Sequence, residues 1–136
     1  MPDPRTATSE PGGAPPNPEL DPTAPGRARE RRETKDGLQL YRYGDGPRVF
    51  VGFHGWGAEH TKSFHSLLAR LPEDVTFWAM DLPGCGGSAA PPQWDWEVVT
   101  GILARGCDQI APARPLSLVG SCSGSFHALA VALERP

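Results

Sequence analysis

The stretch LSLVGSCSGSFHALA, residues 116–130, carries the residue types best placed to do chemistry. A short apolar run ends at Val119, a turn of small residues follows, and an amphipathic helical pattern then begins. A strand, a tight turn and a helix in this order form a nucleophile elbow, in which a reactive side chain stands on a strained backbone. Cys122 is central, with Gly120 and Gly124 two residues away on either side, where only small residues avoid collision. The pattern therefore predicts a G-x-C-x-G elbow with a cysteine nucleophile.

The same turn admits other interpretations. Ser123 is the second candidate nucleophile, because its neighbours at the same spacing, Ser121 and Ser125, are also small. Ser121 is a weaker candidate, because Val119 would then occupy one of the crowded positions. A turn rich in glycine and serine also commonly joins a strand to a helix without any chemistry.

The segment HGWG at 54–57 directly follows another buried apolar run. Acyl transfer needs preorganised N–H donors for the oxyanion that develops on the attacked carbonyl. One donor is the backbone N–H of the residue after the nucleophile, here Ser123, and the other comes from the loop after a neighbouring strand. The N–H of Trp56 is the candidate for this second donor, so the two segments together predict an oxyanion hole.

The remaining residues of these loops are expected to shape the backbone. Gly55 and Gly57 allow the HGWG backbone to come close to a reacting atom. His54 is interpreted as a structural histidine that hydrogen-bonds its loop, and not as a catalytic base. The segment DLPGCGGS at 81–88 predicts a structured turn after a strand, in which Asp81 accepts backbone N–H groups.

Apolar runs and amphipathic stretches alternate along the chain and predict an α/β fold. Strands are expected over residues 38–43, 48–53, 75–80 and 116–119. Helices are expected at three places, with apolar faces formed by Phe64, Leu67, Leu68 and Leu71, by Trp94, Val98 and Ile102, and by Phe126, Leu129, Ala130 and Leu133. This alternation implies a parallel sheet with helices on both faces, in which the strand over 48–53 lies between those over 75–80 and 116–119.

Two local signals refine this expectation. The residues Gly44-Asp45-Gly46-Pro47 are typical of a hairpin turn between the first two strands. Thr61 or Ser63 is the expected cap of the first helix.

The N-terminal segment differs in composition from the rest of the chain. Of the 16 prolines, eight fall within the first 25 residues, and no aromatic residue precedes Tyr41. A segment so poor in large apolar groups buries too little surface to offset its chain entropy. Residues 1–35 are therefore expected to be a disordered tail, and residues 36–136 to fold.

Charge and cysteine content exclude several classes of partner. Acidic residues interrupt the arginines of residues 27–32, and no aromatics interleave them, so no nucleic-acid partner is expected. No apolar run is long enough for a membrane helix or a secretory signal. Three cysteines without framework spacing favour a reducing, cytoplasmic compartment. No metal-binding cluster is apparent, and no cofactor is expected.

The three motifs, in this order and on these elements, resemble those of the α/β-hydrolase superfamily. Its members often read HGWG, DLPGxGxS and LVGxSxGG, and this chain reads HGWG, DLPGCGGS and LVGSCSGS. Within the superfamily, the motifs most resemble those of small carboxylesterases of the kind that cleave the pimeloyl-carrier methyl ester. In having a cysteine at the nucleophile position of the elbow, the chain resembles dienelactone hydrolases and polyester synthases. The resemblance implies a parallel-sheet α/β-hydrolase fold and hydrolysis of a small-molecule ester or related acyl substrate.

The chain also departs from the family pattern. In the family, the catalytic acid and histidine follow the nucleophile after later strands, and no residue here matches those positions. Residues 36–136 are therefore expected to be the N-terminal half of such a domain, truncated after the elbow helix and inactive alone. An acyltransferase working through a Cys122 thioester and a non-catalytic remnant or binding module remain alternatives. The substrate's identity and the oligomeric state stay open.

Overall fold

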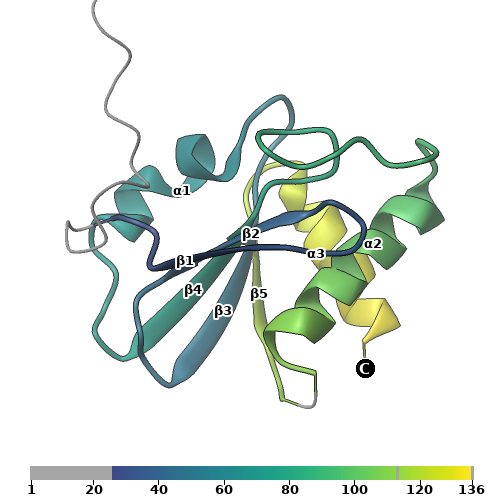
Figure 1. Cartoon of the computed structure of the whole chain (residues 1–136). Coiled ribbons are helices and arrows are strands. Elements are labelled where there is room, and N and C mark those ends of the chain that lie inside the picture. The colour runs from purple at the N-terminus through teal and green to yellow at the C-terminus, as the bar shows by residue number, and fades with distance from the viewer. Residues whose placement is uncertain (1–25, 113, 136) are drawn as a thin grey trace, which may run out of the picture.

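The computed structural model describes residues 26–112 and 114–135 of the chain. In this part, five strands form one sheet in the order β1-β2-β4-β3-β5, and three helices flank it (Figure 1). The strands are β1 (Glu30–Glu33), β2 (Gln39–Tyr43), β3 (Arg48–Phe53), β4 (Val75–Met80) and β5 (Ser117–Gly120). The helices are α1 (His60–Leu68), α2 (Trp96–Ile110) and α3 (Gly124–Glu134).

The centre of the sheet is parallel, as the sequence predicts. Strand β3 lies between β4 and β5 and pairs in parallel with both. The helix between each pair of strands returns the chain to the same end of the sheet, which is how parallel neighbours are connected. The carboxyl ends of β3, β4 and β5 therefore meet at one edge, and the three motifs follow those ends.

The two faces of the sheet carry separate cores. Strand β4 alternates between them: Trp78 and Met80 pack in the core beneath α2 and α3, whereas Phe77 and Ala79 pack in the core beneath α1. This alternation is the period-two geometry of a strand. Figure 1 shows α1 on one side of the sheet and α2 with α3 on the other. The centre of the sheet is thus covered on both faces, and β4 is apolar on both of its sides.

The expected hairpin at residues 44–47 is wrong. Strand β2 does not pair with β3; it pairs antiparallel with β4, so the turn at 44–47 starts a crossover. The hairpin lies one turn earlier, between β1 and β2. There the Thr34 Oγ1 accepts the Leu38 N–H at 3.1 Å, and Gly37 has a φ of 77°. Turn residues mark where a chain changes direction, but they do not determine which strand it pairs with.

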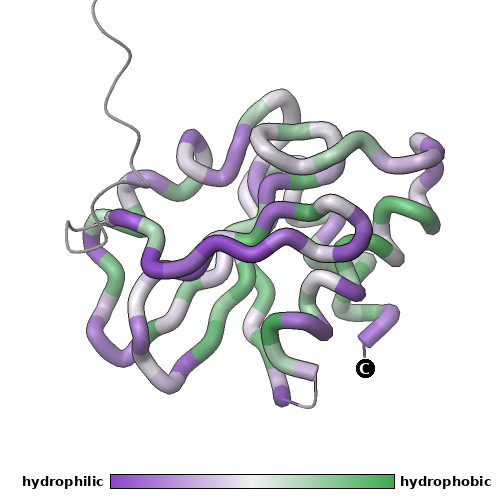
Figure 2. Tube along the Cα trace, in the orientation of Figure 1, coloured by the Kyte–Doolittle hydropathy of each residue, from purple (hydrophilic) through white to green (hydrophobic). Residues whose placement is uncertain are grey.

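The expected tail, residues 1–35, extends too far into the folded part of the chain. Residues 1–25 lie outside the described residues, but Glu30–Glu33 form β1, which pairs with β2. The strand is charged and largely exposed, and Figure 2 shows it as a hydrophilic stretch. It is held by its backbone ladder and by Arg32, whose guanidinium carbon lies 4.7 Å from the centroid of the Trp78 ring. Charge at an edge strand also discourages further strand pairing.

The helix starts differ in part from expectation. Neither Thr61 nor Ser63 caps α1; its N-cap residue is Glu59, which makes no side-chain capping bond. Instead, the His60 N–H at this end donates to the Asp81 carboxylate at 3.1 Å. In α2, by contrast, Asp95 is a conventional cap and accepts the N–H groups of Glu97 and Val98.

The apolar faces expected for α1 and α2 are only partly the packed ones. Phe64 and Leu68 are buried, but Leu67 is exposed and Leu71 lies beyond the end of α1. In α2 the packed side is formed by residues such as Val99, Ile102 and Leu103, whereas Trp94 precedes the helix and is exposed.

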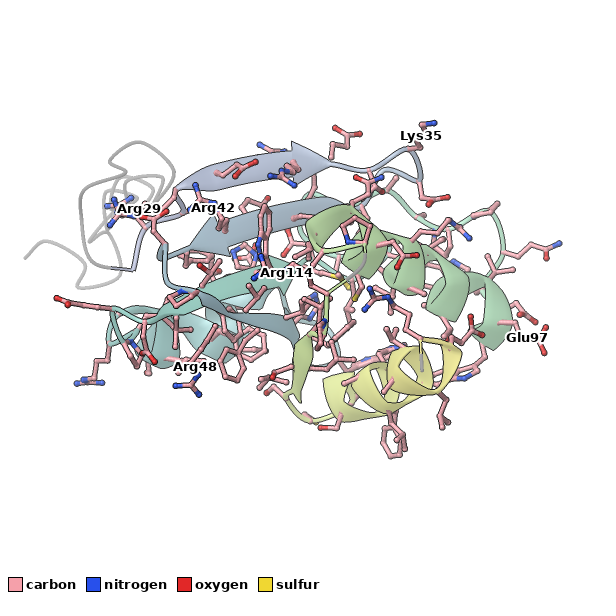
Figure 3. All side chains as sticks on the ribbon, turned by 90° about the horizontal axis from the view of Figure 1, so that it is seen from below. Arg29, Lys35, Arg42, Arg48, Glu97 and Arg114 are labelled. Atoms are coloured by element: carbon pink, nitrogen blue, oxygen red, sulfur yellow. The ribbon has the colours of Figure 1, made fainter. Side chains whose placement is uncertain are left out.

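The apolar face expected for α3 is not the packed face. Phe126, Leu129 and Leu133 are exposed in the described structure, whereas Ala128 and Val131 are buried. Figure 3 shows α3 lying beside α2, and small residues on the packed side allow α3 to lie close to the sheet. The periodicity identified a helix correctly, but it selected the side of the helix that faces away from the core.

Candidate active site

Cys122 stands in the turn between the end of β5 and the start of α3, with a backbone φ of 54°. It is the one non-glycine residue with a positive φ in the described part of the chain. Such a conformation costs about 1–3 kcal/mol and persists only where surrounding structure imposes it. Here the Ser121 N–H donates to the Phe53 carbonyl, and the Gly124 N–H donates to the Ser121 carbonyl, both at 2.9 Å. The turn has the strained geometry of an elbow.

The glycines on either side of Cys122 are required by space. A Cβ on Gly120 would lie 2.3 Å from the Ser125 Cα, and one on Gly124 would lie 2.1 Å from the Phe53 carbonyl oxygen. Neither contact is possible for a real side chain. Ser123, in contrast, has φ −60° and ψ −23°, which is ordinary helical backbone. The strained centre of this turn is therefore residue 122 and not residue 123.

The HGWG loop meets the elbow directly. A Cβ on Gly55 would lie 3.2 Å from the Cys122 Cβ, so a larger residue there would press on the cysteine. Gly57 has a φ of 64° and turns the chain away, and Trp56 between them is 91% exposed. Within the described residues, the N–H groups of Trp56 and Ser123 donate to no other group. Both donors are free to bind an oxygen.

His54 ties the HGWG loop to the loop after β4. The side chain is fully buried, its Nε2 accepts the Leu82 N–H at 2.9 Å, and its Nδ1 lies 2.8 Å from the Gly55 carbonyl. Accepting at Nε2 requires the proton to be on Nδ1, which then donates to Gly55. Burial lowers the pKa of His54 and outweighs the hydrogen bond to Gly55, which favours the charged form. The imidazole is therefore a neutral structural link with both nitrogens in use.

Asp81 organises a buried hydrogen-bond network that no sequence motif predicts in full. Its carboxylate accepts the Gly87 N–H at 3.0 Å and the His60 N–H at 3.1 Å, and the His60 Nδ1 lies 2.6 Å from Oδ1. Burial opposes ionisation, but these hydrogen bonds outweigh it and hold the pKa of Asp81 below its usual value. The backbone contacts match expectation.

His60 is the partner that the sequence analysis missed. Its ring stacks on Tyr41 with centroids 4.2 Å apart, and its Nε2 bonds the Tyr43 hydroxyl at 2.8 Å. The contacts join residues 17 and 21 positions apart, so no local spacing could reveal them. Like His54, His60 has both ring nitrogens engaged.

An apolar cleft of about 880 Å³ opens beside the elbow. Ser123 and the HGWG loop form one side of it, and Leu82 and Pro83 contribute from the loop after β4. Most of the remaining wall is aromatic and comes from Trp94 just before α2, from Trp96 at its first turn, and from Phe126 and His127 in α3. The volume lies within the range of small-molecule sites, which are typically about 300–1,000 Å³.

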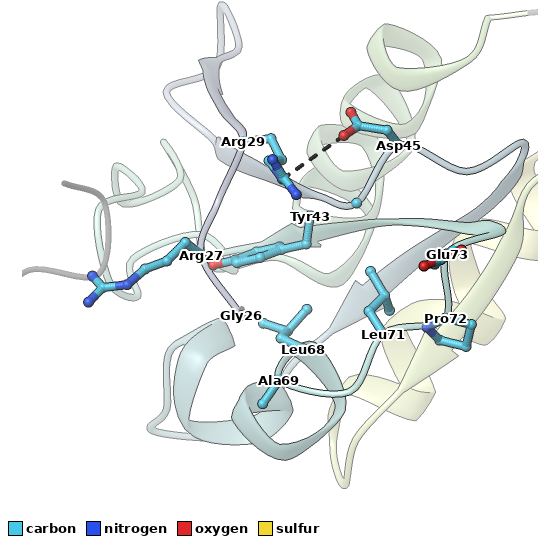
Figure 4. A pocket seen from close by; sticks show the side chains of 11 residues that line it. Gly26, Arg27, Arg29, Tyr43, Asp45, Leu68, Ala69, Leu71, Pro72 and Glu73 are labelled. Atoms are coloured by element: carbon cyan, nitrogen blue, oxygen red, sulfur yellow. Dashed lines mark ion pairs between the residues drawn. The ribbon is translucent and has the colours of Figure 1, made fainter. Parts of the chain in front are cut away.

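A second hollow, of about 320 Å³, lies at the opposite end of the parallel strands (Figure 4). It is bounded by residues 71–73 before β4, by Tyr43 at the end of β2 and by Gly44 after it. Arg29 and Asp45 at its rim approach to 4.0 Å and are exposed. None of the site residues predicted from the sequence lines this hollow.

The described residues contain no group of three or more His, Cys, Asp or Glu side chains that could hold a metal ion. The three cysteines are free: Cys107 is buried, Cys85 is half-buried and Cys122 is exposed. Burial raises the pKa of Cys107 to about 12 and raises that of Cys85 as well. None of the described helices is long and apolar enough to cross a membrane.

A mixed sheet with a parallel centre, helices on both faces and a strained strand–turn–helix junction after β5 is the architecture typical of α/β hydrolases. Residues 49–135 match the model of the alpha/beta hydrolase family, and the chain belongs to that family. No curated protein gives a match.

Solved structures of the same fold are similar over most of this chain. An alpha/beta superfamily hydrolase from Oenococcus oeni PSU-1 is 23% identical with a TM-score of 0.67, over 77% of this chain and 39% of that protein. An epoxide hydrolase from Vigna radiata is 22% identical with a TM-score of 0.67, over 79% of this chain and 36% of that protein. The Cif epoxide hydrolase from Acinetobacter nosocomialis is 20% identical with a TM-score of 0.67, over 80% of this chain and 37% of that protein. The chain thus spans less than two fifths of the length of these proteins.

Proposed function

We propose that this chain supplies the nucleophile and the oxyanion-binding groups of a hydrolase that acts on an ester or related acyl substrate. The observation that carries the proposal is the positive φ of Cys122 between two glycines that tolerate no side chain. Strained residues of this kind cluster at active sites. Ser123 is the alternative nucleophile, but its backbone is helical and unstrained.

The proposed chemistry is thioester formation followed by hydrolysis. The Cys122 thiolate attacks the substrate's carbonyl carbon, a C–S bond forms, and the carbonyl π electrons move to oxygen. The N–H groups of Trp56 and Ser123 bind the oxyanion. The C–O bond to the alcohol then breaks, the alkoxide takes up a proton, and water cleaves the thioester to release the acid and regenerate the thiol.

Cysteine chemistry favours an acyl substrate over an epoxide, although similar structures include epoxide hydrolases. A thiolate that opened an epoxide would form a thioether, which water does not cleave. A thioester, in contrast, can pass its acyl group to water or to another acceptor. Transfer to a second acceptor would make the protein an acyltransferase, and the products formed with and without an added alcohol distinguish the two.

The proposal assigns no general base among the histidines that surround the site. Both ring nitrogens of His54 and of His60 are engaged in hydrogen bonds, and the unpaired Nδ1 of His127 is buried. General-base assistance contributes about 10²–10⁴-fold, so this chain alone is expected to acylate slowly and to show little turnover. A test must therefore detect the covalent step itself.

The test is stoichiometric acylation of the full chain by p-nitrophenyl acetate, followed by mass spectrometry of the intact protein and its peptides. We expect one acetyl group on Cys122, none after Cys122→Ala, and an unchanged yield after the control substitution Cys85→Ala. Iodoacetamide should label Cys122 fastest, because Cys107 is buried and the pKa values of both other thiols are raised. Undiminished acylation of the Cys122→Ala chain, lost on Ser123→Ala, would move the role to Ser123.

A further inference from the structure

His127 lines the aromatic cleft, and one of its ring nitrogens has no hydrogen-bond partner in the described part of the chain. Its ring stacks on Trp96 with centroids 5.0 Å apart and an interplanar angle of 19°. The Nδ1 atom is buried and has no hydrogen-bond partner among the described residues. A leucine or phenylalanine would fill this space between α2 and α3 without leaving a ring nitrogen unpaired, which costs stability.

The ionisation and tautomer of His127 follow from these surroundings. Burial lowers its pKa, with a further contribution from His54, so the ring is neutral at pH 7. An unpaired buried N–H is rarer in proteins than an unpaired buried acceptor. A proton on Nε2 leaves the buried Nδ1 as an unpaired acceptor, and His127 is one of the residues that line the cleft. The imidazole can offer that N–H to a ligand in the cleft.

The rest of the cleft determines what kind of ligand fits beside this donor. Trp56, Trp94, Trp96 and Phe126 supply flat apolar surfaces, and Leu82 and Pro83 are also among the lining residues. The Asp95 carboxylate also borders the cleft, but it accepts the N–H groups of Glu97 and Val98 as the cap of α2. A cleft of this composition favours planar apolar groups and disfavours charged ones.

We propose that the cleft is a binding subsite for a planar apolar group that carries a hydrogen-bond-accepting oxygen, and that the His127 Nε2–H donates to this oxygen. His127 would then be a specificity-determining residue, with its ring orientation fixed by the stack on Trp96. The inference deepens the proposed function, because the Ser123 side of the cleft adjoins Cys122. Binding itself requires no nucleophile, so the two can fail separately.

The test compares two probes of nearly equal shape, 2-acetylnaphthalene and 2-isopropenylnaphthalene, which differ by a carbonyl oxygen in place of a methylene. Dissociation constants are measured on the full chain by calorimetry and by NMR shifts of the tryptophan indole N–H groups. His127→Phe keeps a ring against Trp96 but removes the donor. We expect it to weaken binding of the ketone about fivefold, the usual worth of one neutral hydrogen bond, and to change binding of the hydrocarbon less than twofold.

Further variants separate the possible outcomes. Trp96→Ala should weaken both probes, Cys122→Ala neither, and His65→Phe, on the exposed side of α1, neither. If His127→Phe does not fold, His127→Gln and His127→Leu replace it, and the ratio of the two dissociation constants should be kept by Gln and lost by Leu. Equal effects of His127→Phe on both probes, or the absence of binding by either probe, would overturn the proposal. Loss of acylation with binding intact would contradict the proposed function alone.

Discussion

At the scale of single residues, Cys122 joins a reactive group to a backbone conformation that side chains disfavour. The thiol is exposed, so little packing depends on it, while its φ of 54° is imposed by the hydrogen bonds of the turn. Function and stability therefore oppose each other at this position. The conflict leads to a prediction about a substitution that relieves the strain.

Cys122→Gly should increase the free energy of unfolding by about 0.5–1 kcal/mol, because glycine adopts a positive φ without steric cost. The same substitution should abolish acylation. Urea denaturation measures the first effect and mass spectrometry the second. Ser121→Gly is the control, because its φ is not positive, and it should not stabilise. Loss of stability in the Cys122→Gly chain would show that the turn is not strained.

His54 provides a pH-dependent prediction at the same scale. Its pKa is lower in the folded chain than its unfolded value of about 6.5, so the unfolded chain binds more protons below that pH. The neutral ring's contribution to stability is complete above about pH 6.5 and is lost as the pH falls toward the folded pKa. Unfolding free energy should therefore decrease between pH 7 and pH 5.

His54→Gln removes this titration and should flatten the decrease, although the variant is less stable at pH 7. His65→Gln is the matched control, because His65 is exposed on α1, and it should keep the wild-type slope. The lowered pKa of His127 leaves part of the slope in both variants. An unchanged slope after His54→Gln would show that this ring is not the group responsible.

Some features of the site depend on contacts between residues that are close in sequence, and others depend on elements that meet only in the folded chain. The requirement for Gly120 and Gly124 follows from collisions within a few residues and with the adjoining strand, so the sequence pattern alone predicted the elbow. The hydrogen bond of His54 to its neighbour Gly55 is local as well, whereas its bond to the Leu82 N–H joins loops 28 residues apart. The Tyr43–His60–Asp81 network depends on three separate elements meeting in space. It could be recognised only once the fold was known.

At the scale of elements, α3 shows that apolar periodicity predicts a helix but not which of its faces is buried. Four apolar residues at helical spacing predicted the helix, but three of them are exposed. The packed side carries small residues, because Gly124 lies against the carbonyls of Phe53 and His54 and admits no Cβ. Apolar spacing identifies a common face but not the neighbour that covers it. Close packing on the sheet selected the face with the smaller side chains.

This assignment of faces can be tested in α3. Val131→Ala should lower the free energy of unfolding by about 1–3 kcal/mol, because Val131 is fully buried in the core beneath α2 and α3. Leu129→Ala should change it by less than about 0.5 kcal/mol, because Leu129 is 61% exposed. Both variants are compared by urea denaturation at a protein concentration low enough for the chain to be monomeric, because association changes the apparent stability. A larger effect at Leu129 than at Val131 would mean that α3 is rotated from the position described.

Strand β1 shows that a strand can form where the sequence pattern does not indicate one. Its residues, ERRE, include no apolar side chain, so neither propensity nor alternation indicates a strand. Backbone pairing with β2 and the contact of Arg32 with the Trp78 ring hold it in place. The parallel core strands were predicted because burial on both faces leaves a continuous apolar run, and β1 has no such requirement.

At the scale of the whole molecule, exposed apolar side chains gather around the cleft and on α3. Trp56, Trp94 and Leu133 are 91%, 74% and 76% exposed, and Trp96, Phe126 and Leu129 are also exposed. In the described structure, β5 pairs only with β3, so its other edge offers unpaired backbone groups. Exposed apolar side chains and an open strand edge both favour association between chains.

We therefore expect the 136-residue chain to self-associate through α3 and the open edge of β5. Size-exclusion chromatography with light scattering should give a mass above 14.6 kDa that rises with protein concentration. The double substitution of Leu129 and Leu133 by Gln should shift the population toward the monomer, because it removes apolar area without touching the core. Leu67→Gln, an exposed leucine on the α1 side of the sheet, is the matched control and should leave association unchanged. A monodisperse monomer at every concentration would contradict the expectation and mean that the open edge of β5 is protected in solution.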